Sequence, residues 1–282
     1  MRGFWQRTAL VLIILYSVST AAWTAPKTYT VRFSDMPDAD VVTANGKEAP
    51  TVSANRWLRK NGWEQVWPIV VLGKGKPLDF AGPPQKRFLR IAANKSFFIW
   101  GSEVNLDPQE YPVLELAWGI EAFPNGAAMD LYKRNDRALV VQVLFGDKLT
   151  TTGFPDLPRI LAFFWGETET IGNSYTCIPP REGPADVRIM CIYPHVKYIA
   201  LRSGDEGGVF TDRVNLLDHF REQFPDYWRE HQRAPTIVGL SFEAQSGHTK
   251  SRSSARLYSI RLMSGMDEAD WNGGASGGGA GN

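Results

Sequence analysis

The chain has little cysteine, little histidine and, after its first residues, no long apolar run. Of its 282 residues, 2 are Cys and 4 are His. They do not stand at the spacing of metal ligands, so we predict no metal site. The sequence also lacks a nucleophile-elbow motif and a phosphate-binding glycine loop. We therefore predict no cofactor and assign no catalytic residue.

The chain has no surplus of charge of either sign, which argues against two classes of partner. Lys and Arg together number 31, and Asp and Glu together number 30. Proteins that bind nucleic acid or an anionic membrane surface by electrostatics carry a basic surplus, which this chain lacks. We therefore expect no nucleic-acid partner.

Residues 1–22 are predicted to be a secretory signal peptide. Arg2 and Arg7 form a short basic region before an apolar stretch, Ala9–Val18, whose length is usual for such a signal. Small residues up to Ala22 predict cleavage after that residue. The alternative is an uncleaved anchor, but the stretch is shorter than the ~20 residues that cross a bilayer. We predict a periplasmic or secreted protein with no stable membrane insertion after cleavage.

The two cysteines, Cys177 and Cys191, flank a loop that contains Pro and Gly. A cysteine pair in an exported chain is more often bonded than free, so we predict a disulfide that closes this loop. Two buried free thiols are the alternative.

Short runs rich in β-branched and aromatic residues, bounded by turn residues, predict strands over much of the chain. In one of them Leu114, Leu116 and Trp118 alternate with Glu115, as expected for a strand with one buried face. We therefore predict an all-β fold, an antiparallel β-sandwich that is jelly-roll-like, with one short helix. The predicted strands are Arg87–Ala93, Ser96–Ser102, Val113–Phe123, Ala138–Phe145, Ile160–Gly166, Val187–Tyr193, Lys197–Arg202, Thr236–Glu243 and Arg256–Met263.

Composition divides the mature chain into three parts. Residues 26–82, with a possible first strand, form an N-terminal extension packed on the core, and residues 83–263 form the β-sandwich domain. The Gly-rich residues 264–282 are predicted to be a disordered tail. The one helix is predicted over Val214–Phe224, with Asp212 as its N-cap and Pro225 as its end.

Four segments together resemble the DUF3047 family, a group of uncharacterised exported bacterial proteins. The segments are Pro112–Pro124, Arg134–Phe145, Ile160–Gly166 and Pro235–Leu262. The resemblance covers about Lys86 to Met263 and implies a β-sandwich of the carbohydrate-binding-like kind. It implies no activity.

The chain departs from the family pattern at three motifs. Leu116 stands where a Trp is usual, Asn135–Asp136 replaces a paired Asp, and Glu243–Gln245 replaces an acidic pair. If those acidic pairs hold a structural cation in relatives, this chain has lost part of the ligand set.

Eight residues are predicted to bind a ligand across a concave sheet. Tyr198 and Arg202 alternate onto one strand face, Trp165 offers a ring on which a sugar can stack, and the others are polar strand residues. The alternatives are a core position for Trp165 and solvated charges for the carboxylates. The predicted residues are Glu115, Gln142, Trp165, Tyr198, Arg202, Ser241, Glu243 and Arg261.

These features favour a non-catalytic, exported binding module for a glycan or another cell-envelope component. One alternative is a glycan-cleaving enzyme on a jelly-roll scaffold, which needs two carboxylates about 5–9.5 Å apart. Glu115 and Glu121 are too distant along one strand for that role, but Glu243 with either remains open. The other alternative is a structural or assembly partner of an envelope protein complex.

Overall fold

The computed structural model describes most of the chain between Lys27 and Gly265. The described residues are 27–33, 41–44, 47–50, 54–66, 78–83, 86–131, 134–151, 154–176, 194–204 and 207–265. The predicted signal peptide, the tail beyond residue 265, both cysteines and the predicted strand Val187–Tyr193 lie outside these residues.

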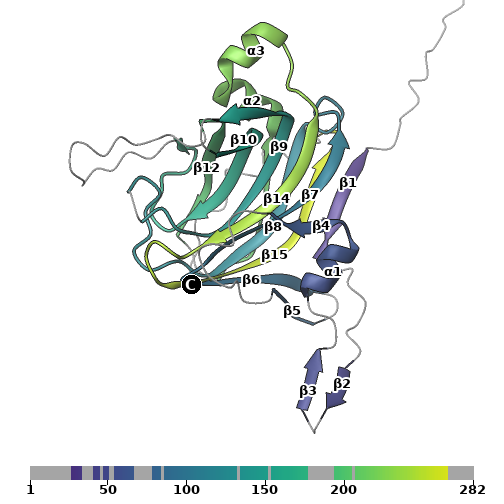
Figure 1. Cartoon of the computed structure of the whole chain (residues 1–282), viewed down its shortest axis with the longest axis vertical. Helices are drawn as coiled ribbons and strands as arrows, with labels where there is room; N and C mark the ends of the chain where they lie inside the picture. Colours follow the sequence, from purple (N-terminus) through teal and green to yellow (C-terminus); the bar gives the residue numbers. More distant parts are fainter. Residues whose placement is uncertain are drawn as a thin grey trace, which may run out of the picture.

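Two β-sheets lie one over the other (Figure 1). The six-stranded sheet has the order β13-β8-β15-β6-β5, and β1 also pairs with β15. Its strands are β1 (Thr28–Arg32), β5 (Asp79–Ala81), β6 (Phe88–Asn94), β8 (Val113–Ala122), β13 (Phe210–Asn215) and β15 (Arg252–Met263).

The seven-stranded sheet has the order β11-β12-β10-β9-β14-β7-β4, and only its β10–β12 pair is parallel. The fold is therefore the predicted β-sandwich. Its strands are β4 (Trp63–Gln65), β7 (Phe97–Leu106), β9 (Arg137–Thr151), β10 (Phe154–Gly166), β11 (Ser174–Tyr175), β12 (Val196–Ser203) and β14 (Ile237–Gln245). A separate hairpin joins β2 (Val41–Ala44) to β3 (Lys47–Pro50).

The inner faces of the two sheets form the core. Leu114, Leu116, Trp118 and Ile120 of β8 are all 0% exposed, which confirms the alternation predicted for this strand. The ring of Trp118 lies 6.1 Å from that of Trp165 in the other sheet. These contacts join the sheets directly.

The described part of the N-terminal region supplies strands to both sheets. β1 and β5 pair in the six-stranded sheet, and β4 pairs in the seven-stranded one. Its apolar side chains, among them Phe33, Leu58 and Trp63, are part of the same core. The region therefore completes the sandwich rather than only covering it.

The single predicted helix is corrected by the structure, which has α1 (Ala54–Lys60), α2 (Leu216–Gln223) and α3 (Pro225–His231). The N-cap of α2 is Asn215, whose side chain accepts hydrogen bonds from the next turn, and Asp212 lies in β13 instead. Pro225 begins α3 because proline suits the first turn of a helix, where an N–H has no partner to lose. No helix among the described residues is long and apolar enough to cross a membrane.

Replacing Trp118 tests the contact between the sheets. Trp118→Ala removes a fully buried ring that is packed against Trp165, so we expect a loss of about 3–5 kcal/mol in the free energy of unfolding. Urea denaturation followed by circular dichroism measures it. Ile171→Ala is the control, because Ile171 is 63% exposed and should change stability by less than about 0.5 kcal/mol.

Candidate functional site

The eight predicted ligand-binding residues lie in three places. Gln142, Tyr198, Ser241 and Glu243 lie on the outer face of the seven-stranded sheet, the face turned away from the core between the sheets. Trp165 and Arg202 belong to the region between the sheets. Glu115 and Arg261 lie together on the six-stranded sheet.

The residues on the seven-stranded sheet form a closed polar network. Ser241 Oγ donates to Gln142 Oε1 at 2.6 Å, and Gln142 Nε2 donates to Glu243 Oε2 at 2.8 Å. The other oxygen of Glu243 accepts from Arg137 Nη2 at 2.7 Å. Glu243 is 1% exposed and its partners are also buried. Both oxygens of the Glu243 carboxylate are therefore already bound by side chains of the protein.

Arg137 joins Tyr198 to this network. Its guanidinium lies 4.5 Å from the centre of the Tyr198 ring, a cation–π contact, and also donates to Gln245 Oε1 at 2.8 Å. Burial acts to lower the pKa of Arg137, but it is outweighed by the negative charges that Tyr198 and Glu243 carry at the high pH where arginine titrates, so the pKa is raised. Glu243–Gln245, which departs from the family pattern, thus binds an arginine in this chain.

A second departing motif, Asn135–Asp136, anchors the turn that follows β14. Asp136 accepts hydrogen bonds from the backbone N–H groups of His248 and Thr249 and from Thr249 Oγ1. Asn135 Oδ1 lies 2.6 Å from His248 Nδ1. Among the described residues, no group of three or more His, Cys, Asp or Glu is arranged to hold a metal ion.

Trp165 and Arg202 do not reach the face on which Tyr198 lies. The pairing of β10 with β12 shifts between Phe164 and Trp165, so Arg202 is opposite Trp165. This bulge turns Arg202 toward the core side, because an extra residue in one strand reverses the alternation. Arg202 then pairs with Asp212 at 2.7 Å. Trp165 is 1% exposed and is a core residue.

Carboxylates on the outer face of β8 are also bound by arginine. Glu115 accepts from Arg213 Nε and from Arg261 Nη1, each at 2.7 Å, through its two oxygens. The three residues are directly opposite one another on neighbouring strands, in the order β13, β8, β15. Opposite charges at such positions stabilise a sheet. Further along β8, Glu121 accepts from Arg256 and Ser254.

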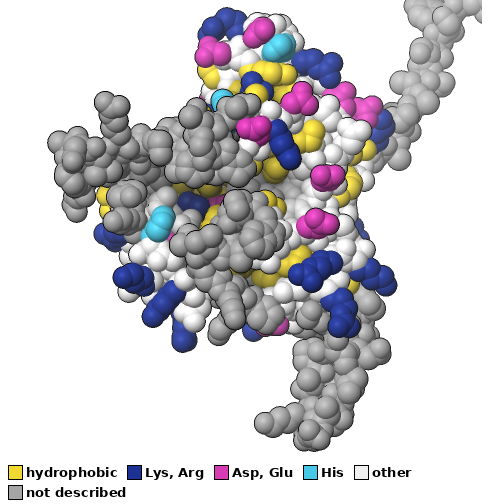
Figure 2. Space-filling model, in the orientation of Figure 1, with side chains coloured by type: hydrophobic (Ala, Val, Ile, Leu, Met, Phe, Trp, Pro, Cys, Tyr) yellow, Lys and Arg dark blue, Asp and Glu magenta, His cyan; other side chains and the backbone are white. Residues whose placement is uncertain are grey.

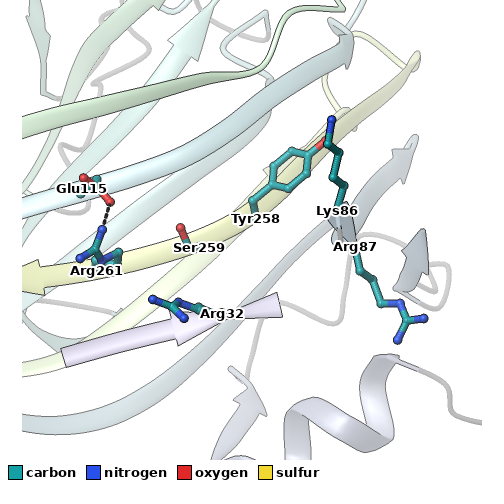
Figure 3. Close-up of a pocket in the computed structure, with 7 residues that line it drawn as sticks. All are labelled: Arg32, Lys86, Arg87, Glu115, Tyr258, Ser259 and Arg261. Atoms are coloured by element: carbon teal, nitrogen blue, oxygen red, sulfur yellow. Dashed lines mark hydrogen bonds and ion pairs between the residues drawn. The ribbon is translucent and has the colours of Figure 1, made fainter. Parts of the chain in front are cut away.

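A cavity of about 260 Å³ opens beside Glu115 (Figure 3). We call it the junction cavity, and it contains two predicted site residues, Glu115 and Arg261. Figure 3 shows Lys86 pointing toward the ring of Tyr258 and Arg87 pointing away from it. The lining residues are Arg32, Lys86, Arg87, Glu115, Tyr258, Ser259 and Arg261.

The junction cavity lies where β15 changes partners. Residues up to Leu257 pair with β6, and residues from Ser259 onward pair with β1. Tyr258 falls between them, at a register shift against β8. Arg32 ends β1, and Lys86 and Arg87 precede β6, so the ends of two strands meet at this point. The gap between those ends provides the space.

The sequence does not indicate most of this cavity. Tyr258 and Ser259 belong to the predicted strand Arg256–Met263, but Arg32, Lys86 and Arg87 are distant from them in the chain. No local pattern indicates that β15 pairs with two strands in succession on one side. The cavity can be located only from the register of β15 against β6 and β1.

A family model described as "Protein of unknown function (DUF3047)" matches residues 79–261, more than half of the chain. The chain belongs to the DUF3047 family. The match confirms the resemblance found in the sequence. Within this DUF3047 protein the matched range runs from β5 into β15 and includes every residue of the junction cavity except Arg32.

No curated protein matches the chain. Solved structures that are similar to it at low identity include two glycan-degrading enzymes. Endoglucanase 3 of Trichoderma harzianum, from family GH12, shows 9% identity and a TM-score of 0.33, covering 72% of this chain and 91% of that one. A thermostable cellulase derived from Cel12A of Rhodothermus marinus shows 11% identity and a TM-score of 0.34, covering 84% and 100%. Both TM-scores are below 0.5, so neither enzyme's activity bears on this chain.

Breaking the buried Arg137–Glu243 pair should lower the stability of the fold. Glu243→Ala leaves the guanidinium of Arg137 buried without its carboxylate, and we expect a loss of about 3–5 kcal/mol in the free energy of unfolding. The double variant Arg137→Met, Glu243→Ala should recover part of this loss, because no unpaired charge remains. Urea denaturation of the variants measures both effects. The single variant Arg137→Met completes the comparison, and strict additivity of its loss and that of Glu243→Ala in the double variant would contradict the pairing.

Glu121 makes stability depend on pH. Burial acts to raise its pKa, but hydrogen bonds from Ser254 and Arg256 and the charge of Arg90 outweigh burial, so the pKa is lowered. A lowered pKa stabilises the fold above the pKa of the unfolded state, and this contribution is lost as pH falls through the folded pKa. Glu121→Gln should therefore be less stable than wild type at pH 7.

The difference between Glu121→Gln and wild type should shrink as the pH is lowered toward about 3, below the usual glutamate pKa. Urea denaturation over a pH series measures it. The matched control is Glu103→Gln, because Glu103 is an exposed glutamate of β7. A difference that is constant across the pH series would contradict the assigned role.

Proposed function

We propose that the protein is an exported, non-catalytic binding module that holds a glycan or another cell-envelope component in the junction cavity. The observation that carries the proposal is the cavity itself, on the outer face of a sheet, with an aromatic ring, a hydroxyl group and charged donors around it. Binding sites for small ligands combine such a concave surface with a few polar groups that fix orientation.

The chemistry of the cavity suits a hydroxylated ligand. Tyr258 contributes a ring on which a sugar face can stack, and Ser259 and the arginines contribute hydrogen-bonding groups. The volume, about 260 Å³, is near the lower end of the usual range for ligand pockets, roughly 300–1,000 Å³. Such a volume suits one unit or one end of a ligand rather than a long buried chain.

The arrangement of carboxylates favours binding over cleavage. Glu115, Glu121 and Glu243 each accept a hydrogen bond from at least one arginine. A glycosidase needs one carboxylic acid that keeps its proton near neutral pH, and a raised pKa supplies it. At Glu121, hydrogen bonds from Ser254 and Arg256 outweigh the effect of burial and lower the pKa instead.

Thermal-shift screening against an array of oligosaccharides tests the proposal, using the mature chain from Trp23. A ligand present at about 100 times its Kd should add about 2.7 kcal/mol to the free energy of unfolding. Tyr258→Ala should weaken any response about tenfold or more in affinity, because it removes the ring from the cavity. Tyr227→Ala, in α3, removes a ring elsewhere and should leave the affinity unchanged.

Two results would contradict the proposal. Release of new reducing ends from a bound saccharide would show cleavage and favour the enzyme. No response to any saccharide would remove the glycan ligand, and a pull-down from envelope extract would then test a protein partner.

A further inference from the structure

The charges around the junction cavity are unequal. Its lining has four cationic side chains, Arg32, Lys86, Arg87 and Arg261, and one carboxylate, that of Glu115. The whole chain is nearly neutral, with 31 basic and 30 acidic residues. The positive charge at the cavity is therefore a local concentration that the total charge conceals.

Glu115 does not neutralise this concentration. Its two oxygens are 2.7 Å from Arg213 and Arg261, so one carboxylate is shared by two guanidinium groups. Among the described residues, Arg32 and Lys86 form no ion pair with any acidic side chain. The cluster as a whole keeps an excess of positive charge.

The fold brings these cations together from separate parts of the chain. Arg32 stands at the end of β1, directly opposite Ser259 of β15, and Lys86 lies just before β6. Figure 3 shows Arg32 and Arg261 on neighbouring strands, with Ser259 between them and the ring of Tyr258. Like charges gathered around one hollow repel one another, and a bound anion removes that repulsion.

Figure 2 shows Lys and Arg at the lower left, at the lower right and at the top of the molecule, and Asp and Glu at the top and right. Basic and acidic side chains are thus mixed on this face, and the positive excess is assigned from the lining of the junction cavity alone.

We propose that the junction cavity recognises an oxyanion group, a carboxylate, phosphate or sulfate, carried by its ligand. This inference rests on the proposed function, whose ligand class it narrows to acidic glycans such as those built from uronate or phosphorylated sugar units. Arginine donors match the oxygens of such a group, and Lys86 adds a point charge. Tyr258 and Ser259 then contact the uncharged part of the ligand.

Isothermal titration calorimetry with four probes tests this inference. The probes are a trigalacturonate, glucose 6-phosphate, a neutral cellotriose and inorganic phosphate, each titrated at about 20 mM and 300 mM salt. We expect one of the two acidic sugars to bind at least tenfold more tightly than cellotriose. Its affinity should fall several-fold at the higher salt, because salt screens exposed charges.

Variants that remove a positive charge test whether the acidic sugar binds in this cavity. Arg32→Gln and Lys86→Gln should each weaken binding of the acidic sugar about fivefold or more. Lys148→Gln, an exposed lysine of β9 outside the cavity, is the matched control and should bind as wild type does. Both test residues lie at the surface, so the variants should fold normally, and circular dichroism checks that they do.

The outcomes separate this inference from the proposed function. Equal affinity for cellotriose and the acidic sugars, or no effect of either variant, overturns the oxyanion site and leaves glycan binding in place. Binding of inorganic phosphate that is lost in Arg32→Gln, with no binding of any sugar, supports the oxyanion site and overturns the glycan. No binding of any probe contradicts both.

Discussion

The burial of two apolar sheet faces against each other is the constraint on which the other features of this protein depend. Each strand has a period of two, so placing Leu114, Leu116 and Trp118 inside also fixes which residues face outward. Glu115 and Glu121 are turned away from the core for this reason. The outer faces of both sheets therefore carry the polar chemistry.

Three carboxylates on those outer faces are bound by arginine. Glu243 is held by Arg137, Glu115 by Arg213 and Arg261, and Glu121 by Arg256. The Glu243 pair is buried, and a buried charge without a partner would be strongly unfavourable. These pairs fix the side chains in place. The junction cavity lies instead where β1 ends and β6 begins.

The partner exchange of β15 connects the fold to the proposed function. A long strand that pairs first with β6 and then with β1 must pass a point at which neither is beside it. Residues that end β1 and precede β6 meet at that point, and both ends carry cations. The cavity and its charge thus have one structural cause. The residues matched by the DUF3047 family model include all of the cavity lining except Arg32.

The sequence by itself determined the fold class and most of the strands, because alternation and β-branched composition are local properties. It also showed the family, through the resemblance of its motif segments to other members. Alternation along each strand also placed Ser241 and Glu243 on the same face of their strand. The pairing of β14 with β9 then brings that face beside Gln142. Only the tertiary structure decided the rest. A one-residue bulge turned Arg202 from the face of Tyr198 to that of Trp165, and Asn215 rather than Asp212 capped α2 because β13 extends to that residue. The junction cavity likewise depends on strand register between segments far apart in the chain, and register is set by packing across the whole sandwich rather than by any local pattern.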